Sequence, residues 1–476
     1  MINILQKPRQ KIYPLFILFC LFCISFLCHS ARAAWSLTPR ENTAICRAVG
    51  QQSGLQMVGD GAGGAIVVWE DARESHFDIY AQRIDAHGDV LWMEDGVPIC
   101  TAPENQNKPR IVSDGEGGAI ITWQDIRKAG GNYDIYVQRV NAKGEVLWAS
   151  NGVPVCTVDN TQNTPCIATD GAGGAIIVWQ DYRTNYADLF AQRVNKHGEL
   201  LWVENGIPVC LTSGAQSAPV MVEDGTGGAI VAWQDFRRNY ADIYAQRIDG
   251  SGNRLWDIMG IPVCAALGHE NLPALIGNKA EGAIVVWVDT RNGNNDIFAQ
   301  QVDGSGGVQW LENGIPVCAV AGNQNNPVIT SDGAGGALIA WWDMRSGESD
   351  IYAQSVDLAG NVQWGNDGLA VCVEMGIQNH VGITNDGAGG MVLAWGDNRT
   401  SAFDLFAQRI DRKGIALWEK NGLAISTALN TQCFPVLLGD GTGGAMVIWQ
   451  DDRQKEKTYW DVYAQRINGQ GSLGEK

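Results

Sequence analysis

Acidic and basic side chains recur through this chain at a fixed spacing. The pattern W-x-D-x-R occurs eight times, and a second aspartate, in Asp-Ile-Tyr or a close relative of it, follows each copy. Two carboxylates facing each other could serve as acid and base in glycoside hydrolysis, whereas a carboxylate beside an arginine could form a charge-assisted latch. A catalytic site needs one such set and this chain has eight. We therefore predict structural latches at Asp71, Arg73, Asp125, Arg127, Asp181, Arg183, Asp235, Arg237, Asp289, Arg291, Asp343, Arg345, Asp397, Arg399, Asp451 and Arg453.

Cysteine also recurs once per copy. Seven of the 12 cysteines occupy equivalent positions, where the eighth copy has Ser426: Cys46, Cys100, Cys156, Cys210, Cys264, Cys318 and Cys372. We expect them to be free thiols packed as small apolar groups, and Cys156 with Cys166 is the one pair for which a bridge stays open. The chain has no Cys-x-x-Cys-His haem motif and its histidines are scattered. We predict no metal site and no cofactor.

A polar column follows the cysteine column and offers candidate ligand contacts. It includes Gln106, Gln162, Gln324 and Gln378, usually followed by Asn and then, two residues on, by Pro. Amides pair well with sugar hydroxyls and with peptide backbone, but they also cap turns ahead of proline. The sequence leaves both interpretations open.

One loop departs from the repeat more than the others do. After Arg453 the chain reads "QKEKTYWD", which adds Lys455, Lys457, Tyr459 and Trp460. A ligand that distinguishes one copy from seven near-copies should contact such a departure, and exposed aromatic faces beside lysines suit a sugar ring or an anionic group. Alternatively, Trp460 covers a joint between the two ends of the chain.

The repeat indicates which elements carry these residues. The tryptophans of W-x-D-x-R are Trp69, Trp123, Trp179, Trp233, Trp287, Trp341, Trp395 and Trp449, each 54 or 56 residues after the last. Within one copy, short runs rich in β-branched residues alternate with Gly or Asn-Gly turns, and no helical apolar spacing is present. Four strands per unit of this length predict an all-β, eight-bladed β-propeller of four-stranded blades.

The repeat is split between the two ends of the chain. The last copy stops after three strands, at about residue 468, whereas residues 34–46 have the Trp and Cys of a fourth strand without the first three. We predict that the N-terminal strand pairs into the C-terminal blade and closes the ring, with the propeller spanning 34–468 and a flexible tail at 469–476.

The first 33 residues have the pattern of a secretory signal peptide. Lys7, Arg9 and Lys11 precede the apolar run 15–28, and Ala31-Arg32-Ala33 resembles a cleavage site. Its removal changes the formal net charge from −18 to −22, and no basic tract remains, which argues against nucleic acid as a partner. We expect a monomer without a transmembrane segment, secreted, periplasmic or at the cell surface.

Two stretches of the repeat resemble known propellers. "VVWVDTRNGNNDIFAQQVDGSG" (285–306) is similar to the TolB-type repeat, and "RVNAKGEVLW" (139–148) resembles the quinoprotein-like eight-bladed propellers. The latter group includes enzymes that bind pyrroloquinoline quinone and a periplasmic scaffold. The whole unit most resembles repeats of secreted bacterial propellers that have no assigned activity.

These observations predict an exported, non-catalytic binding or scaffold propeller with a protein or carbohydrate ligand. Two alternatives stay open, a glycan-acting enzyme of the sialidase-like type and a quinone-dependent dehydrogenase. The first would need paired carboxylates in the loops of one blade, and the sequence offers none.

Overall fold

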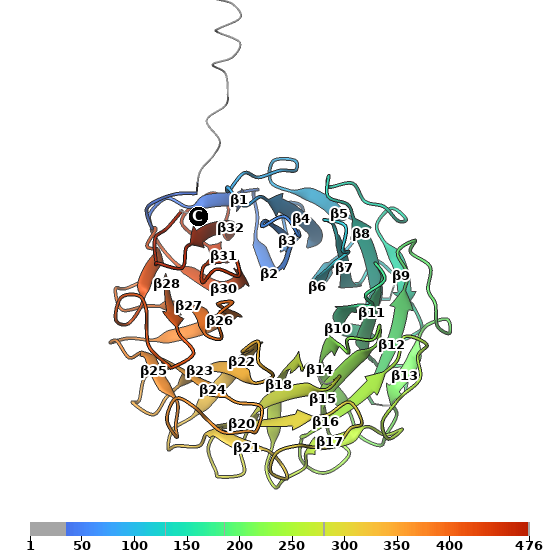
Figure 1. Cartoon of the computed structure of the whole chain (residues 1–476). Helices are drawn as coiled ribbons and strands as arrows, with labels where there is room; N and C mark the ends of the chain where they lie inside the picture. The colour runs from blue at the N-terminus through green and yellow to red at the C-terminus, as the bar shows by residue number, and fades with distance from the viewer. Residues whose placement is uncertain (1–34, 129, 185, 279–280, 475–476) are drawn as a thin grey trace, which may run out of the picture.

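The computed structural model describes residues 35–128, 130–184, 186–278 and 281–474. These residues form eight four-stranded antiparallel sheets arranged as blades in a ring (Figure 1). The inner strand of each blade lines a central channel. The predicted eight-bladed β-propeller is confirmed. The described residues contain strands and turns but no helix, and therefore no helix that could span a membrane. The predicted signal peptide lies outside the described residues.

The first four blades follow one another along the chain. Blade 1 contains β2 (Gln52–Gly59), β3 (Ala65–Asp71), β4 (Asp78–Ile84) and β5 (Val97–Cys100). Blade 2 contains β6 (Gln106–Ser113), β7 (Ala119–Asp125), β8 (Asp134–Val140) and β9 (Val153–Cys156). Blade 3 contains β10 (Gln162–Thr169), β11 (Ala175–Asp181), β12 (Asp188–Val194) and β13 (Ile207–Cys210). Blade 4 contains β14 (Gln216–Glu223), β15 (Ala229–Asp235), β16 (Asp242–Ile248) and β17 (Ile261–Cys264).

The other four blades repeat this pattern, and the last one takes its outer strand from the N-terminal segment. Blade 5 contains β18 (Glu270–Gly277), β19 (Ala283–Asp289), β20 (Asp296–Val302) and β21 (Ile315–Cys318). Blade 6 contains β22 (Gln324–Ser331), β23 (Ala337–Asp343), β24 (Asp350–Val356) and β25 (Leu369–Cys372). Blade 7 contains β26 (Gln378–Asn385), β27 (Met391–Asp397), β28 (Asp404–Ile410) and β29 (Leu423–Ser426). Blade 8 contains β30 (Gln432–Gly439), β31 (Ala445–Asp451), β32 (Asp461–Ile467) and β1 (Thr43–Cys46).

The core lies between neighbouring blades. The second strand of blade 3, AIIVWQD, is buried along its whole length, because it is covered on both faces, and this explains its unbroken apolar run. Trp179 on this strand is fully buried, as are the seven equivalent tryptophans. Its ring leaves room only for glycine at the facing Asn-Gly turn, since a Cβ on Gly206 (φ 86°) would lie 2.5 Å from the ring.

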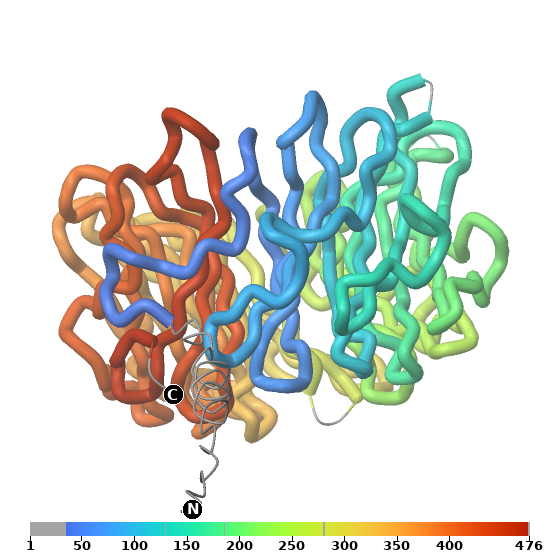
Figure 2. The backbone as a smooth tube through the Cα atoms, turned by 90° about the horizontal axis from the view of Figure 1, so that it is seen from above, coloured from blue at the N-terminus to red at the C-terminus, as the bar shows by residue number. Residues whose placement is uncertain are grey.

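Strand β1 closes the ring as the split repeat predicts. It pairs antiparallel with β32, with Thr43 opposite Ala464, and the N-terminal segment lies against the C-terminal strands in Figure 2. Trp35, Ile45 and Cys46 are buried in the joint. The eighth sheet therefore has the same four-stranded order as the others.

The structure answers one question that the sequence left open and adds detail at the C-terminal end. Cys156 and Cys166 are both free and buried in the structure, so the bridge between them is absent. Hydrogen bonding also continues past residue 468, since Leu473 bridges to Ile467 and the Gly474 amide donates to the Arg466 carbonyl oxygen. The described part of the expected tail, 469–474, thus lies against blade 8 as a turn.

Candidate functional site

Each Asp-x-Arg pair lies at the end of the second strand of its blade. In blade 3, the Arg183 guanidinium donates to both carboxylate oxygens of Asp181, at 2.8 and 2.6 Å, and to the Asn205 carbonyl oxygen at 2.8 Å. The carboxylate also accepts from the indole N–H of Trp179 at 2.8 Å, and the guanidinium stacks on the Phe190 ring at 3.8 Å. Every one of these contacts is internal to the protein, and Asp181 is fully buried. The same pairing occurs in all eight blades.

The cysteine column takes part in these latches from the neighbouring blade. The Cys156 Sγ, on the outer strand of blade 2, lies 3.7 Å from Asp181 Oδ2 and 3.2 Å from Arg183 Nη2, both in blade 3. Burial raises the pKa of this thiol to about 12, so it stays protonated and can donate to the carboxylate. The thiols are therefore polar partners between blades, and the expectation of purely apolar packing was incomplete. In the eighth latch, Ser426 and Asn42 contact Arg453 instead.

The glutamines of the polar column do not face a ligand-accessible surface. Gln106, Gln162, Gln324 and Gln378 are all fully buried at the start of the inner strands. The Gln106 side-chain amide donates to the backbone carbonyl oxygens of Ala102 and Glu104, and its backbone N–H donates to the carbonyl oxygen of Phe77 in the preceding blade at 2.7 Å. These contacts agree with the turn-capping interpretation and not with a ligand-binding column.

Blade 5 has Glu270 where the other seven blades have glutamine. Oxygen and sulfur atoms of Glu270, Cys264 and Asp289 lie within 4.8 Å of one another, a spacing that could hold a metal ion. However, Arg291 already occupies this cluster, with its Nη2 3.1 Å from Cys264 Sγ and 2.5 Å from Asp289 Oδ2. The cluster is therefore a latch with one additional carboxyl group.

Glu270 should be neutral at pH 7. Burial, together with the charges of Asp289 and Asp242, raises the pKa of its carboxyl group to about 8. Both of its carboxyl oxygens lack a hydrogen-bond partner among the described residues. In its protonated form, Glu270 has nearly the shape of the glutamine that fills this position elsewhere.

The Glu270→Gln substitution is expected to stabilise the protein at neutral and alkaline pH. The folded state keeps the Glu270 proton up to about pH 8, whereas the unfolded chain releases it near pH 4.5, so wild-type stability falls as pH rises through this window. The variant has no ionisable group at this position, so its stability does not fall with pH for this reason. The difference in unfolding free energy should be near zero at pH 4 and reach about 4 to 5 kcal/mol at pH 8 to 9, as measured by denaturant unfolding. A difference that does not change with pH would contradict a raised pKa.

The long loop after Arg453 lies partly on the surface. Lys455, Lys457 and Tyr459 are exposed, and Trp460 is half-buried. The Trp460 carbonyl oxygen accepts a hydrogen bond of 2.8 Å from the Gln52 amide, which joins blade 8 to blade 1. Trp460 thus lies at the ring-closing joint, and the loop presents two lysines and one aromatic ring to solvent.

The channel mouth carries a ring of side chains that sequence reasoning missed. In every blade the inner strand has a β-bulge two residues after the buried Gln or Glu, and the bulged residue has a left-handed φ of 48° to 65°. Bulges of this kind redirect a side chain, and a left-handed residue other than glycine costs on the order of 1 kcal/mol or more. These eight residues, here called the mouth ring, are Gly54, Lys108, Thr164, Ala218, Leu272, Asn326, His380 and Phe434.

Members of the mouth ring contact one another across blade boundaries. The Lys108 ammonium donates to Thr164 Oγ1 at 3.2 Å, and the His380 and Phe434 rings lie 4.1 Å apart. The ring therefore has a polar side and an aromatic side. The aromatic side opens into a pocket of about 410 Å³ that is also lined by Gln56. Burial lowers the pKa of His380, which favours its neutral form.

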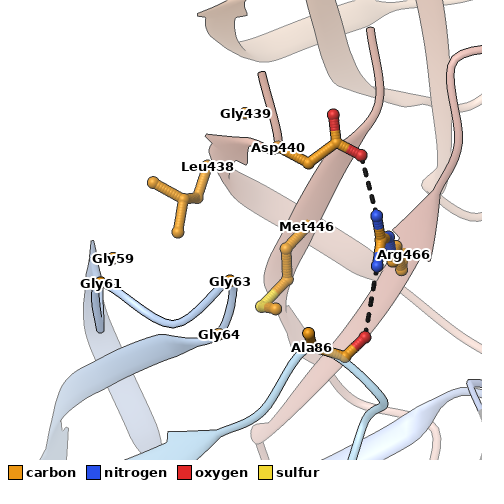
Figure 3. A pocket seen from close by; sticks show the side chains of 10 residues that line it. All are labelled: Gly59, Gly61, Gly63, Gly64, Ala86, Leu438, Gly439, Asp440, Met446 and Arg466. Atoms are coloured by element: carbon orange, nitrogen blue, oxygen red, sulfur yellow. Dashed lines mark hydrogen bonds and ion pairs between the residues drawn. The ribbon is translucent and has the colours of Figure 1, made fainter. Parts of the chain in front are cut away.

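A second pocket, of about 430 Å³, lies between blades 8 and 1 at the end of the inner strands that is farther from the mouth ring (Figure 3). Gly59 and Gly439 end the two inner strands there and leave the space open. Its charged groups are already paired, since Arg466 donates to Asp440 at 3.0 Å and to the Ala86 carbonyl oxygen at 3.3 Å. A ligand would find few free polar groups there.

Comparison with known proteins gives similarity in structure only. No family model and no curated protein matches the chain. A Dyadobacter fermentans protein of unknown function is 10% identical, with a TM-score of 0.40, covering 91% of this chain and 98% of its own. A puromycin-hydrolysing peptidase of Mycobacterium tuberculosis is 12% identical, with a TM-score of 0.45, and the match covers 88% of this chain and 61% of the peptidase. An α-L-arabinanase of Penicillium chrysogenum, complexed with arabinobiose, is 13% identical, with a TM-score of 0.38, and the match covers 67% of this chain and 97% of the arabinanase. Similarities this distant assign no function to the chain.

Proposed function

We propose that this protein is an exported, non-catalytic binding propeller that holds a protein or carbohydrate ligand at the mouth of its central channel. The observation that carries this proposal is the mouth ring. Residues that are the same in every blade, such as those of the latches, contact only other parts of the protein. The mouth ring differs from blade to blade, although its backbone conformation is the same in all eight.

The chemistry of the mouth ring suits recognition better than catalysis. Its described members include one amine, one imidazole, a hydroxyl, an amide and two large apolar groups, but no carboxylate. A carboxylate beside the mouth ring, Glu70, accepts hydrogen bonds from the Lys108 backbone N–H at 2.7 Å and from the Ser53 hydroxyl at 3.2 Å. Hydrolysis of a glycosidic bond would need two opposed carboxyl groups here. The glycan-acting and quinone-dependent alternatives have no comparable support.

The aromatic side of the mouth ring is the expected centre of the contact. Phe434 is 48% exposed, and His380 packs against it, so a flat apolar face is presented to solvent beside Gln56. Aromatic faces give contact area at a low cost in side-chain entropy and suit a sugar ring or an apolar side chain. Lys108 and Asn326 add donors and an acceptor elsewhere on the mouth ring.

A test compares binding of wild type and variants to glycan and peptide arrays. The double variant His380→Ala/Phe434→Ala is expected to bind the array hit at least about tenfold more weakly, with little change in melting temperature, because alanine already occupies this position in blade 4. Leu358→Ala is the matched control, since this residue is exposed to 57% in a turn at the opposite face of the ring.

The Trp460→Ala variant separates this site from the long loop in blade 8. We expect it to bind normally and to melt at a lower temperature, because the substitution removes the half-buried Trp460 ring from the joint between blades 8 and 1. The backbone hydrogen bond to Gln52 is retained. If the loop variants Lys455→Ala and Trp460→Ala lost binding while the mouth variant kept it, the proposal would be overturned in favour of the loop.

A further inference from the structure

The central channel contains a cavity of about 590 Å³ below the mouth ring. Its walls are the eight inner strands, and most of the residues that line it have apolar side chains, Ile111, Ile167, Leu275, Ile329 and Leu437 among them. A cavity of this volume matches a ligand of drug-like size. Arg110, on β6, is the only charged residue among the described residues that line it.

Arg110 departs from its own repeat position. Each inner strand places the equivalent residue two positions beyond the mouth ring, opposite the middle of the second strand. This residue is Gln56 in blade 1, Cys166 in blade 3, and valine, alanine or glycine in the other five blades. The cation is therefore a feature of one blade and not of the framework.

The Arg110 guanidinium has almost no partner within the protein. Among the described residues its one hydrogen bond is to the Pro109 carbonyl oxygen, at 3.1 Å, and it forms no ion pair with a carboxylate. Every latch arginine, by contrast, binds a carboxylate through two nitrogens. Burial lowers the pKa of Arg110, and the charge of Glu70 opposes this shift without forming an ion pair with the guanidinium.

We propose that Arg110 binds the carboxylate of an amphipathic monocarboxylate whose apolar body lies in the central channel. The inference rests on the proposed binding role of the channel mouth, because the mouth is the route by which a ligand reaches Arg110. The guanidinium fork matches a carboxylate, and one cation neutralises one negative charge.

Isothermal titration with decanoate, decanol and acetate tests this proposal. The wild type should bind decanoate at least about tenfold more tightly than decanol or acetate, because only decanoate supplies both the charge and the apolar body. Arg110→Gln should remove the preference for decanoate over decanol. Glutamine already occupies this position in blade 1, so the variant should fold and melt at or above the wild-type temperature.

The matched control is Arg412→Gln, which removes an exposed arginine in a turn at the opposite face and should leave decanoate binding unchanged. Equal decanoate affinity in wild type and Arg110→Gln, or an equal loss in Arg412→Gln, would overturn the inference. The outcome is independent of the arrays. An array ligand that depends on the mouth ring, together with no decanoate preference, would leave the proposed function standing and remove the carboxylate site.

Discussion

Deleting residues 35–46 is expected to lower the melting temperature of this propeller by about 10 °C or more and to make it associate. The segment contributes β1, three buried side chains at Trp35, Ile45 and Cys46, and the indole N–H of Trp35 that donates to the Ala86 carbonyl oxygen. Loss of a single buried tryptophan costs ~3–5 kcal/mol, and the deletion also exposes the edge of β32. Differential scanning calorimetry and size-exclusion chromatography measure both effects.

Two additions make this prediction specific. Leu37→Ala changes a residue of the same segment that is 69% exposed, and it should leave the melting temperature nearly unchanged. A synthetic peptide of residues 35–46, added to the deleted protein, should restore part of the lost stability. Strand β1 is not connected in sequence to the other strands of blade 8, so a separate peptide can pair with β32 in the same way. A deleted protein that is as stable and monomeric as the parent would contradict closure by this strand.

The Arg183→Ala substitution is expected to cost ~3 kcal/mol or more in unfolding free energy. It removes two hydrogen bonds to Asp181, one to the Asn205 carbonyl oxygen and the stacking on Phe190, and it leaves a fully buried carboxylate with one fewer counterion. Breaking a buried pair on one side is more destabilising than replacing both partners. Denaturant unfolding measures the loss, and binding of the array ligand by the folded protein should not change.

A double-mutant cycle separates the pair from general damage. Asp181→Ala combined with Arg183→Ala should cost less than the sum of the single substitutions, because the double variant buries no unpaired charge. Arg183→Lys should fall between wild type and Arg183→Ala, since lysine keeps the charge but not the fork. Unchanged stability with lost binding would mean that the Asp-x-Arg ring is a binding surface.

The fold could be predicted from the sequence because the motif of one blade recurs eight times. One copy of W-x-D-x-R followed by Asp-Ile-Tyr is a weak signal, but eight copies at nearly constant spacing specify both the four-stranded unit and the number of blades. The split between Trp35 at one end and the three-strand copy ending near Ile467 also predicted the ring closure. These conclusions depend on the spacing of the repeated motif and on the alternation of apolar runs with turns, and both are visible in a linear sequence.

The candidate site was less visible because it depends on backbone conformation. The stretch "QNKP" suggested a turn-capping or ligand-binding Gln106, whereas the structure buries that side chain and presents Lys108 through a left-handed bulge. The presence of a lysine in the sequence does not indicate that its φ is positive. A signal was nevertheless present, since the third residue of this stretch differs in all eight copies while its neighbours recur. The same comparison would have singled out Arg110.

The split blade also has a consequence for the order of folding. Seven blades are built from consecutive antiparallel hairpins, so their strands need only short loops to meet, and each blade can form as the chain emerges. Blade 8 is different, because Thr43 must find Ala464 across almost the entire propeller. Loop-closure entropy grows with the logarithm of that separation and is offset only once the intervening blades have curved into a ring. The first of the described strands to be synthesised is therefore the last to pair. Until β1 pairs with β32, the edges of both strands stay unpaired in the folding chain.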